Sequence, residues 1–237
     1  YAMDKSLEVR TPRGGMARFD YWENDSGYRY FFKARRDDEV RMFLSQQALL
    51  LARLYRSTGD PSQARRSAVI IDRFAQVFPD WCYHYDYPFR QKVIYDGDVP
   101  PSQYQNDFRT ARWHWWAYTD IPISLIEAYG LIRDSGVFEE LSEEQGTDVK
   151  ARIVQDFFLN AGEQVYANKD NLTNMSPGTW RDMVRLGIVL QEPKYVHEVV
   201  RRLERMFTEK YFYDGFWPEG APSYGQQTTI SLMQVLN

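Results

Sequence analysis

The sequence lacks several chemical groups on which whole classes of protein depend. Its 237 residues include a single cysteine, Cys82, and three histidines. One cysteine excludes an internal disulfide framework and a metal site built from cysteines alone. The histidines His84, His114 and His197 are too widely spaced for a ligand pair of the HxxxH kind. We therefore expect no metal site and no cofactor.

Long apolar runs and an excess of positive charge are also missing. No apolar run approaches the roughly 18–20 residues that a membrane-spanning helix needs. The chain starts Tyr1-Ala2-Met3-Asp4, which is not a signal peptide. A formal net charge of −4 argues against bulk attraction to nucleic acid. The composition predicts one large globular domain, or a piece of a bigger protein, with neither membrane nor nucleic acid as partner.

Aromatic residues, by contrast, are abundant, with 7 Trp, 17 Tyr and 14 Phe. Aromatic rings stack on sugar rings, and they also fill cores. Core and interface packing is expected to account for most of them, so their number is a hint of carbohydrate binding and no more.

Apolar residues recur at helical spacing through most of the chain. The stripe that starts at Val40 predicts a helix from Asp37. A second helix follows a short turn, with Asp60 as its cap and Pro61 at its first position. Further stripes predict helices at 113–134, 148–167, 179–190 and 194–210, and from Gln226 onward.

The predicted fold is all-α. Residues 1–36 show no clear period and are expected to form an irregular lead-in, and residues 78–112 a long functional loop. No segment predicts a strand convincingly. Over 37–237, helical hairpins with alternating short and long connections fit an incomplete (α/α) toroid. A tetratricopeptide array fits less well, because a sustained period of ~34 residues is missing.

Two polar turns are the most informative motifs. Residues 213–224 read YDGFWPEGAPSY, and residues 171–180 read NLTNMSPGTW. Glycine reaches positive φ and proline fixes φ, so the first segment must turn sharply. Such a turn can hold the Tyr224 hydroxyl at the rim of a cleft.

Together these segments resemble the Asn and Tyr segments of the heparinase II/III-like and alginate-lyase group of polysaccharide lyases. The resemblance covers roughly residues 110–237. It implies a secreted or periplasmic enzyme with an (α/α) toroid and a β-sandwich portion, and the sandwich is absent from this chain, which ends within a helix at Asn237. The implied reaction is β-elimination on an acidic polysaccharide, such as a glycosaminoglycan or alginate.

The resemblance also implies residue roles. β-Elimination removes the C5 proton of a uronate beside a carboxylate whose charge opposes the reaction. Asn174 matches the residue that neutralises this carboxylate, with Asn171 as a competitor, and Tyr224 matches the acid/base. Met175 and Gly225 stand where the family often has histidine. A structural alternative stays open for each: a helix cap or Asx-turn for Asn174, and packing on Trp217 for Tyr224.

A third segment, residues 105–116, supplies secondary candidates. Its cations and aromatic rings could bind a substrate carboxylate or sulfate and stack on a sugar, although burial of the Trp residues is the default. The complete set of candidates is Tyr224, Asn174 and His114 for catalysis and Arg109, Arg112, Trp113, Asn171, Trp217, Glu219 and Arg181 for substrate binding.

Two other functions compete with the lyase. A glycoside hydrolase on a similar toroid needs two carboxylates across a cleft, for which the loop segments offer Glu219, Asp182, Asp96 and Asp98. A non-enzymatic helical module that binds carbohydrate needs no catalytic group at all. Product chemistry separates them, because elimination leaves an unsaturated uronate and hydrolysis does not.

Overall fold

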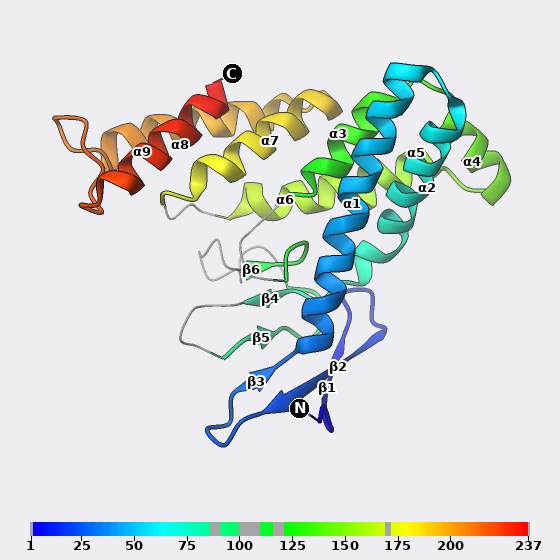
Figure 1. The fold of residues 1–237 in the computed structure, drawn as a ribbon, viewed down its shortest axis with the longest axis horizontal. Coiled ribbons are helices and arrows are strands. Elements are labelled where there is room, and N and C mark those ends of the chain that lie inside the picture. The colour runs from blue at the N-terminus through cyan, green and yellow to red at the C-terminus, as the bar shows by residue number, and fades with distance from the viewer. Residues whose placement is uncertain (1, 86–90, 100–109, 116–120, 169–171, 237) are drawn as a thin grey trace.

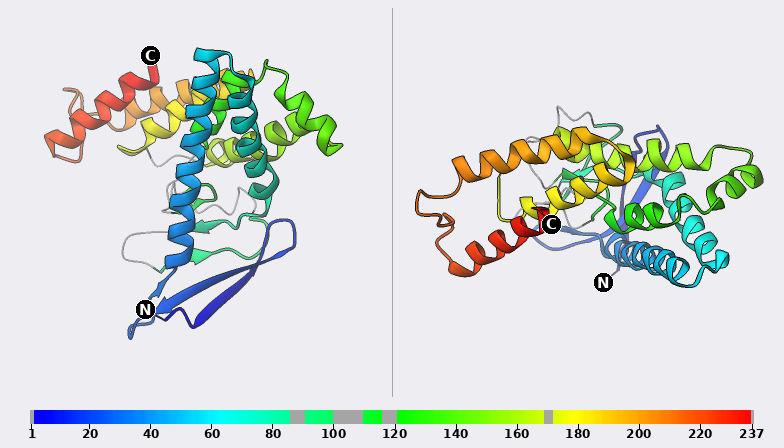
Figure 2. Two further views of the ribbon diagram at one scale, coloured as in Figure 1. Left: turned by 45° about the vertical axis from the view of Figure 1, so that its right-hand side comes forward. Right: turned by 90° about the horizontal axis from the view of Figure 1, so that it is seen from above.

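The structure is a computed structural model that describes residues 2–85, 91–99, 110–115, 121–168 and 172–236. Most of the described chain is helical, as the sequence predicts, and two small antiparallel sheets lie below the helices (Figure 1). Helices α1, α2 and α3 form one group. Helices α7, α8 and α9 form an arm that extends from it to one side (Figures 1 and 2).

The N-terminal segment corrects the prediction of an irregular lead-in without strands. It forms a three-stranded sheet, β1 (Lys5–Arg10), β2 (Met16–Glu23) and β3 (Arg29–Tyr30), in that order. Gly14 adopts a φ of 86° in the β1–β2 turn, which only glycine reaches readily. In β2 the apolar side chains Ala17, Phe19 and Tyr21 alternate with polar ones, so the strand period of two was present in the sequence.

The first helical hairpin matches its prediction closely. Helix α1 (Phe32–Thr58) begins five residues earlier than expected, and α2 (Pro61–Val77) begins at the expected proline. Gly59 ends α1 at a φ of 71°, and the Asp60 carboxylate accepts the Ser62 N–H at 2.9 Å. This cap satisfies one of the free N–H groups at the start of α2.

The second sheet lies within residues 78–112 and corrects their prediction as a loop without strands, and residues 113–115, where a helix was predicted to start, are not helical. After a 3₁₀ turn (Phe78–Asp80), the order is β5-β4-β6, with β4 (His84–Tyr85), β5 (Val93–Ile94) and β6 (Thr110–Ala111). Helix α3 (Ile123–Ile132) starts only after Pro122. Proline lacks the N–H that a helix interior needs, and this explains why the helix does not extend back to residue 113.

The remaining helices follow the predicted stripes, except for one short helix, α4, that was not predicted. The predicted helix at 148–167 exists as one continuous rod whose middle is π-helical at Arg152–Leu159. The elements are α4 (Val137–Gln145), α5 (Val149–Ala151), the π-helical segment, α6 (Asn160–Ala167), α7 (Ser176–Leu190), α8 (Pro193–Glu209) and α9 (Pro222–Leu236).

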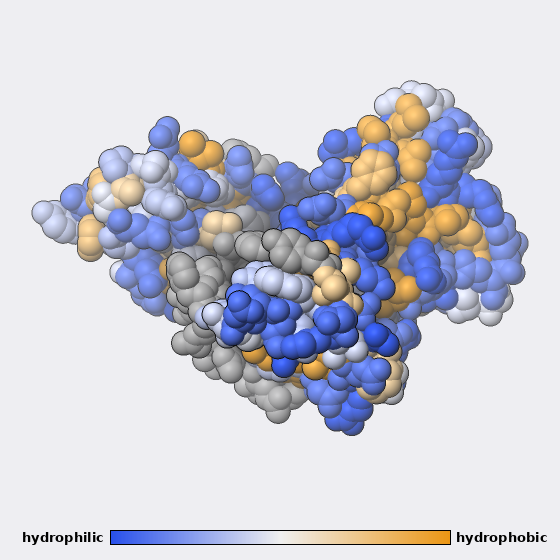
Figure 3. Space-filling model, turned by 60° about the horizontal axis from the view of Figure 1, so that its bottom comes forward, coloured by the Kyte–Doolittle hydropathy of each residue, from blue (hydrophilic) through white to orange (hydrophobic). Residues whose placement is uncertain are grey.

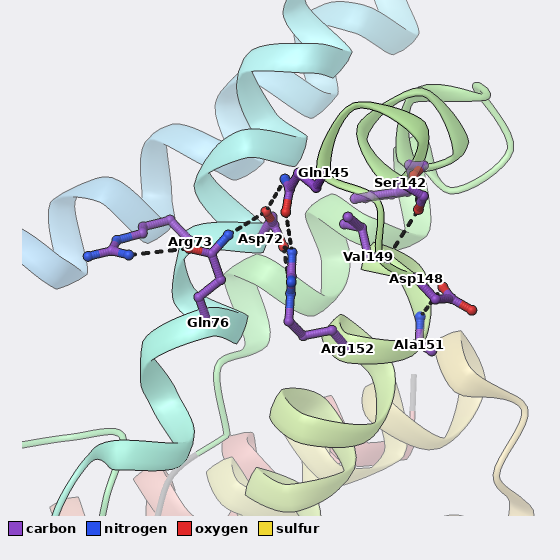
Figure 4. Close-up of polar contacts among 10 residues, drawn as sticks. Asp72, Arg73, Gln76, Ser142, Gln145, Asp148, Val149, Ala151 and Arg152 are labelled. Carbon is purple, nitrogen blue, oxygen red and sulfur yellow. Dashed lines mark hydrogen bonds and ion pairs between the residues drawn. The ribbon is translucent and has the colours of Figure 1, made fainter. Parts of the chain in front are cut away.

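A continuous hydrophobic core joins these elements, and polar groups cross-link it. Phe74, Phe78 and Phe157 lie at its centre, with ring centroids 4.8–6.3 Å apart. Beside it, Asp72 on α2 accepts hydrogen bonds from Gln145 on α4, at 2.8 Å, and from Arg152 in the π-helical segment, at 2.5 Å (Figure 4). The carboxylate therefore ties three helical elements together.

One face of α1 is apolar and exposed. Apolar surface runs along the side of the molecule where α1 lies (Figure 3). None of the described helices combines the length and the apolarity that a bilayer crossing requires. The exposed apolar residues of this strip are Val40, Phe43, Leu44, Leu50 and Leu54.

Candidate functional site

Asn174 lies in the turn directly before α7. The turn is closed by its neighbours: the Thr173 N–H donates to Ser176 Oγ at 2.9 Å, and the Met175 N–H donates to Thr173 Oγ1 at 3.2 Å. Thr173 and Ser176 therefore close this turn, no side chain caps α7 by a hydrogen bond, and neither structural alternative for Asn174 is seen among the described contacts. Within the described parts of the chain, the half-buried Asn174 amide makes no hydrogen bond.

Tyr224 lies in the first turn of α9 and is 46% exposed. The segment before it turns sharply as predicted, with Gly215 at a φ of 82° and Gly220 at 72°. The backbone of Tyr224 is engaged by the helix, but its hydroxyl has no hydrogen-bond partner among the described residues. The hydroxyl is thus available to a ligand.

Trp217 holds this turn in place and is not a surface for a sugar. It is 4% exposed, and its ring packs edge-on against Tyr211 with centroids 5.3 Å apart. Its Nε1–H donates to the exposed Glu219 carboxylate at 2.6 Å. The predicted substrate-binding role of Trp217 is corrected, because the indole is buried in the core. Glu219 serves as the acceptor that fixes the indole.

The helices that carry Asn174 and Tyr224 are neighbours. α7 and α9 pack against each other and run in the same direction along the arm, while α8 runs the opposite way (Figure 1). The first turn of each helix presents backbone N–H groups and the positive end of the helix dipole, which attract anions. We call the first turns of α7 and α9, with Asn174 and Tyr224, the arm site.

Arg181 and Asp182 form an ion pair on α7. The half-exposed Arg181 guanidinium donates to Asp182 Oδ1 at 2.8 and 2.9 Å. Burial raises the pKa of Asp182 to about 6, against the lowering effect of Arg181. The Arg181 side chain is 42% exposed, so part of it faces solvent.

Arg112 is buried in the interior, which corrects its predicted role in binding substrate. It is 5% exposed, and its guanidinium donates to the Phe78 carbonyl at 2.8 Å and to the Trp81 carbonyl at 2.9 Å. It also donates to Asn160 Oδ1 at 2.9 Å and to the Tyr83 hydroxyl at 3.2 Å. The side chain cross-links three parts of the chain, and four of its five N–H donors are used inside the protein.

Trp113 is corrected in the same way. It is 4% exposed and packs among Trp81, Phe74 and Phe157, with ring centroids 5.5–5.7 Å apart. The Arg41 guanidinium lies 4.3 Å from its ring centroid, within the range of a cation–π interaction. No face of the indole is left for a sugar ring.

His114 is half-buried and lies against α1, apart from the arm site. It lines a cavity of about 520 Å³ whose other described walls all come from α1, between Arg35 and Gln46. Asn174 and Tyr224 do not line this cavity, so the structure does not bring the three predicted catalytic residues together in it. Arg109 and Asn171 lie outside the described residues.

The carboxylates that a hydrolase would use fall into two groups. Asp96 is bound by Arg10 at 2.8 Å, and Glu219 and Asp182 are held by Trp217 and Arg181 as described above. Asp98 differs, because it lines a cavity of about 570 Å³ into which two further acids, Asp156 and Glu163, also face.

A further cavity was not predicted as a site. It has a volume of about 500 Å³ and lies between β2, the N-terminal half of α1 and the segment from Asp80 to Trp115. His84 lines it together with Trp81 and Trp115. The sequence signal was the dense aromatic composition of 78–115. We call it the aromatic cavity.

No group of three or more His, Cys, Asp or Glu side chains suited to a metal ion occurs among the residues that the structure describes. The chain matches no family model, and no curated protein or solved structure is significantly similar to it.

Proposed function

We propose that the protein is a polysaccharide lyase that cleaves a uronic-acid-containing polysaccharide by β-elimination, on an incomplete (α/α) toroid. One observation carries the proposal. The Asn174 amide and the Tyr224 hydroxyl, the two groups that this chemistry requires, are both unused by the protein and lie at the same end of two packed helices.

Each residue has a defined task in the reaction. The Asn174 amide donates a hydrogen bond to the uronate carboxylate and so stabilises the charge that develops as C5 loses its proton. Tyr224, acting as the phenolate, takes that proton and becomes the phenol. The electron pair forms the C4–C5 double bond, the bond from C4 to O4 breaks, and the Tyr224 phenol returns the proton to O4. Arg181 and the positive ends of α7 and α9 attract the acidic chain.

The test is to incubate the protein with a panel of glycosaminoglycans and alginate and to follow the near-ultraviolet absorbance of unsaturated uronate. We expect Tyr224→Phe to lower the rate by about 10²–10⁴-fold and Asn174→Ala by about 10²–10³-fold. Tyr213→Phe is the matched control, because Tyr213 is fully exposed in the same turn, and its rate should be unchanged.

A second candidate, a glycoside hydrolase, is favoured by the cavity that Asp98 shares with Asp156 and Glu163. It predicts new reducing ends without ultraviolet absorbance, and loss of activity in Asp98→Asn or Asp156→Asn. An absorbance rise that survives in Tyr224→Phe would refute the roles given to the arm site. With neither signal on any substrate, a carbohydrate-binding module becomes the better explanation.

A further inference from the structure

The aromatic cavity contains a buried side chain whose hydrogen-bonding groups are unused. His84 is 2% exposed and lines the cavity, and neither ring nitrogen has a hydrogen-bond partner among the described residues. The His114 backbone lies near the ring without reaching hydrogen-bond geometry. A buried polar group without a partner costs about 1–3 kcal/mol, so such a group calls for an explanation in the structure.

The charge state of His84 limits what it can bind. Burial, with Lys92 and Arg41 nearby, holds the pKa of His84 well below its ordinary value. A neutral imidazole presents one N–H donor and one acceptor nitrogen. A carboxylate offers only acceptors and an ammonium only donors, so each would leave one nitrogen unpaired. Hydroxyl groups both donate and accept, and a molecule with several of them can pair both nitrogens.

The walls of the cavity favour an uncharged ligand with apolar faces. The Trp115 ring stacks on Phe19 with centroids 5.9 Å apart, and it lies 5.1 Å from the His84 ring. Lys92 Nζ lies 4.4 Å from the centroid of the same indole. The charged side chains on the walls balance, and the innermost pair, Asp38 and Arg41, is a buried ion pair. The four basic residues are Arg18, Lys33, Arg41 and Arg112, and the four acidic ones are Asp20, Asp37, Asp38 and Asp80.

These features together define a ligand class. A volume of about 500 Å³ lies within the range of small-molecule sites, ~300–1,000 Å³, which combine aromatic walls with a few polar groups. Sugar rings have apolar faces that cover an indole and edges that carry several hydroxyls. We propose that the aromatic cavity binds one uncharged sugar unit, with hydroxyls paired to His84 and an apolar ring face against the aromatic wall of the cavity. This site is separate from the arm site and does not rest on the proposed reaction.

The experiment measures binding of simple sugars to the whole chain by tryptophan fluorescence and calorimetry. The probes are methyl glucoside, methyl galactoside, methyl mannoside and N-acetylglucosamine, with glucuronate and glucosamine as charged counterparts. We expect saturable binding of at least one uncharged sugar, and binding at least about tenfold weaker for the charged ones. No binding of any uncharged sugar, or equal binding of a charged one, would overturn the proposal.

Variants separate this cavity from other sites. His84→Leu should weaken binding at least about tenfold, whereas His84→Gln, which keeps a donor and an acceptor, should bind within a few-fold of the wild type. His197→Leu is the matched control, because His197 is exposed on α8. Tyr224→Phe should bind normally even where it abolishes cleavage. Unchanged affinity in His84→Leu would overturn the proposal.

A second measurement keeps the test decisive if His84→Leu does not fold. In wild-type protein labelled with ¹⁵N-histidine, the ring nitrogen signals of His84 should shift on addition of the sugar that binds. Signals that stay fixed at saturation mean that the cavity holds water only, and they would contradict the proposal.

Discussion

The interior around Arg112 and the arm site differ in how the protein uses its own polar groups. Around Arg112, every guanidinium nitrogen donates to a carbonyl, an amide or a hydroxyl of the same chain. At the arm site, the Asn174 amide and the Tyr224 hydroxyl have no partner among the described residues. Satisfied groups hold the fold together, whereas unused ones are available to a ligand. Substitutions in the first region should therefore change stability, and in the second activity.

Arg112→Met should have the largest effect on stability. The substitution removes four hydrogen bonds and takes away the side-chain donor of the Trp81 carbonyl, whereas the Phe78 carbonyl keeps the Trp81 N–H at 3.0 Å. We expect a loss of about 3 kcal/mol or more in the free energy of unfolding, measured by urea denaturation. Arg205→Met is the control, since Arg205 pairs with Glu209 at the surface and should cost about 0–1 kcal/mol. Equal losses in both variants would remove the contrast between the two regions.

The next largest expected effect is the contribution of Asp182 to the pH dependence of stability. Its pKa is raised to about 6 by burial from an ordinary value of 3.8, so the folded state binds the proton more tightly than the unfolded state. This contribution to stability is present below about pH 4 and is lost as the pH rises through about 6. Wild type should lose on the order of 2–3 kcal/mol more than Asp182→Asn between pH 4 and pH 7.5.

Denaturant titrations of both proteins at the two pH values measure this difference. The acids whose pKa values are lowered by ion pairs, such as Asp80 and Asp96, act in the opposite direction but are present in both proteins. They cancel in the comparison. A pH dependence that is the same with and without Asp182 would show that this carboxyl is solvated in solution.

The smallest effect should come from the turn before α7. Ser176→Ala removes the acceptor of the Thr173 N–H and should cost about 1 kcal/mol, the usual net value of one hydrogen bond. Asn174→Ala should change stability by less than about 0.5 kcal/mol, because its amide supports no described contact. Thermal denaturation of the two variants measures both losses of stability. If Asn174→Ala is the more destabilising, Asn174 is a structural residue and the arm site loses its neutralising group.

The first helical hairpin could be predicted from the sequence, because the residues that end one helix and begin the next are neighbours in the chain. Gly59, Asp60 and Pro61 lie next to one another and determine the end of α1 and the start of α2. The N-terminal strands were not predicted, because residues 1–36 show no helical period and the alternation of apolar and polar side chains in β2 covers only a few residues. The short strands of 78–112 were missed because each has only two residues, and the pairing of β6 with β4 depends on residues far apart in sequence.

The candidate site was predictable only in part, for the same reason. The glycines and prolines of 213–224 indicate the turn, but the burial of Trp217 and the exposure of Tyr224 depend on how α9 packs. Arg112 carries a charge that sequence alone assigns to the surface, and only the fold reveals that carbonyls from 78–81 surround it. The sequence does not show that His84 lines a cavity, because the walls of that cavity come from three segments that are far apart in the chain.

The apolar strip on α1 determines how the purified protein should respond to its buffer. Five large apolar side chains along one helix face are exposed to water. Sulfate and phosphate are excluded from protein surfaces and so strengthen contacts between such faces, whereas urea weakens them. Salting-out should thus drive molecules together along α1 first, and light scattering should rise in ammonium sulfate well before the helical signal in circular dichroism changes.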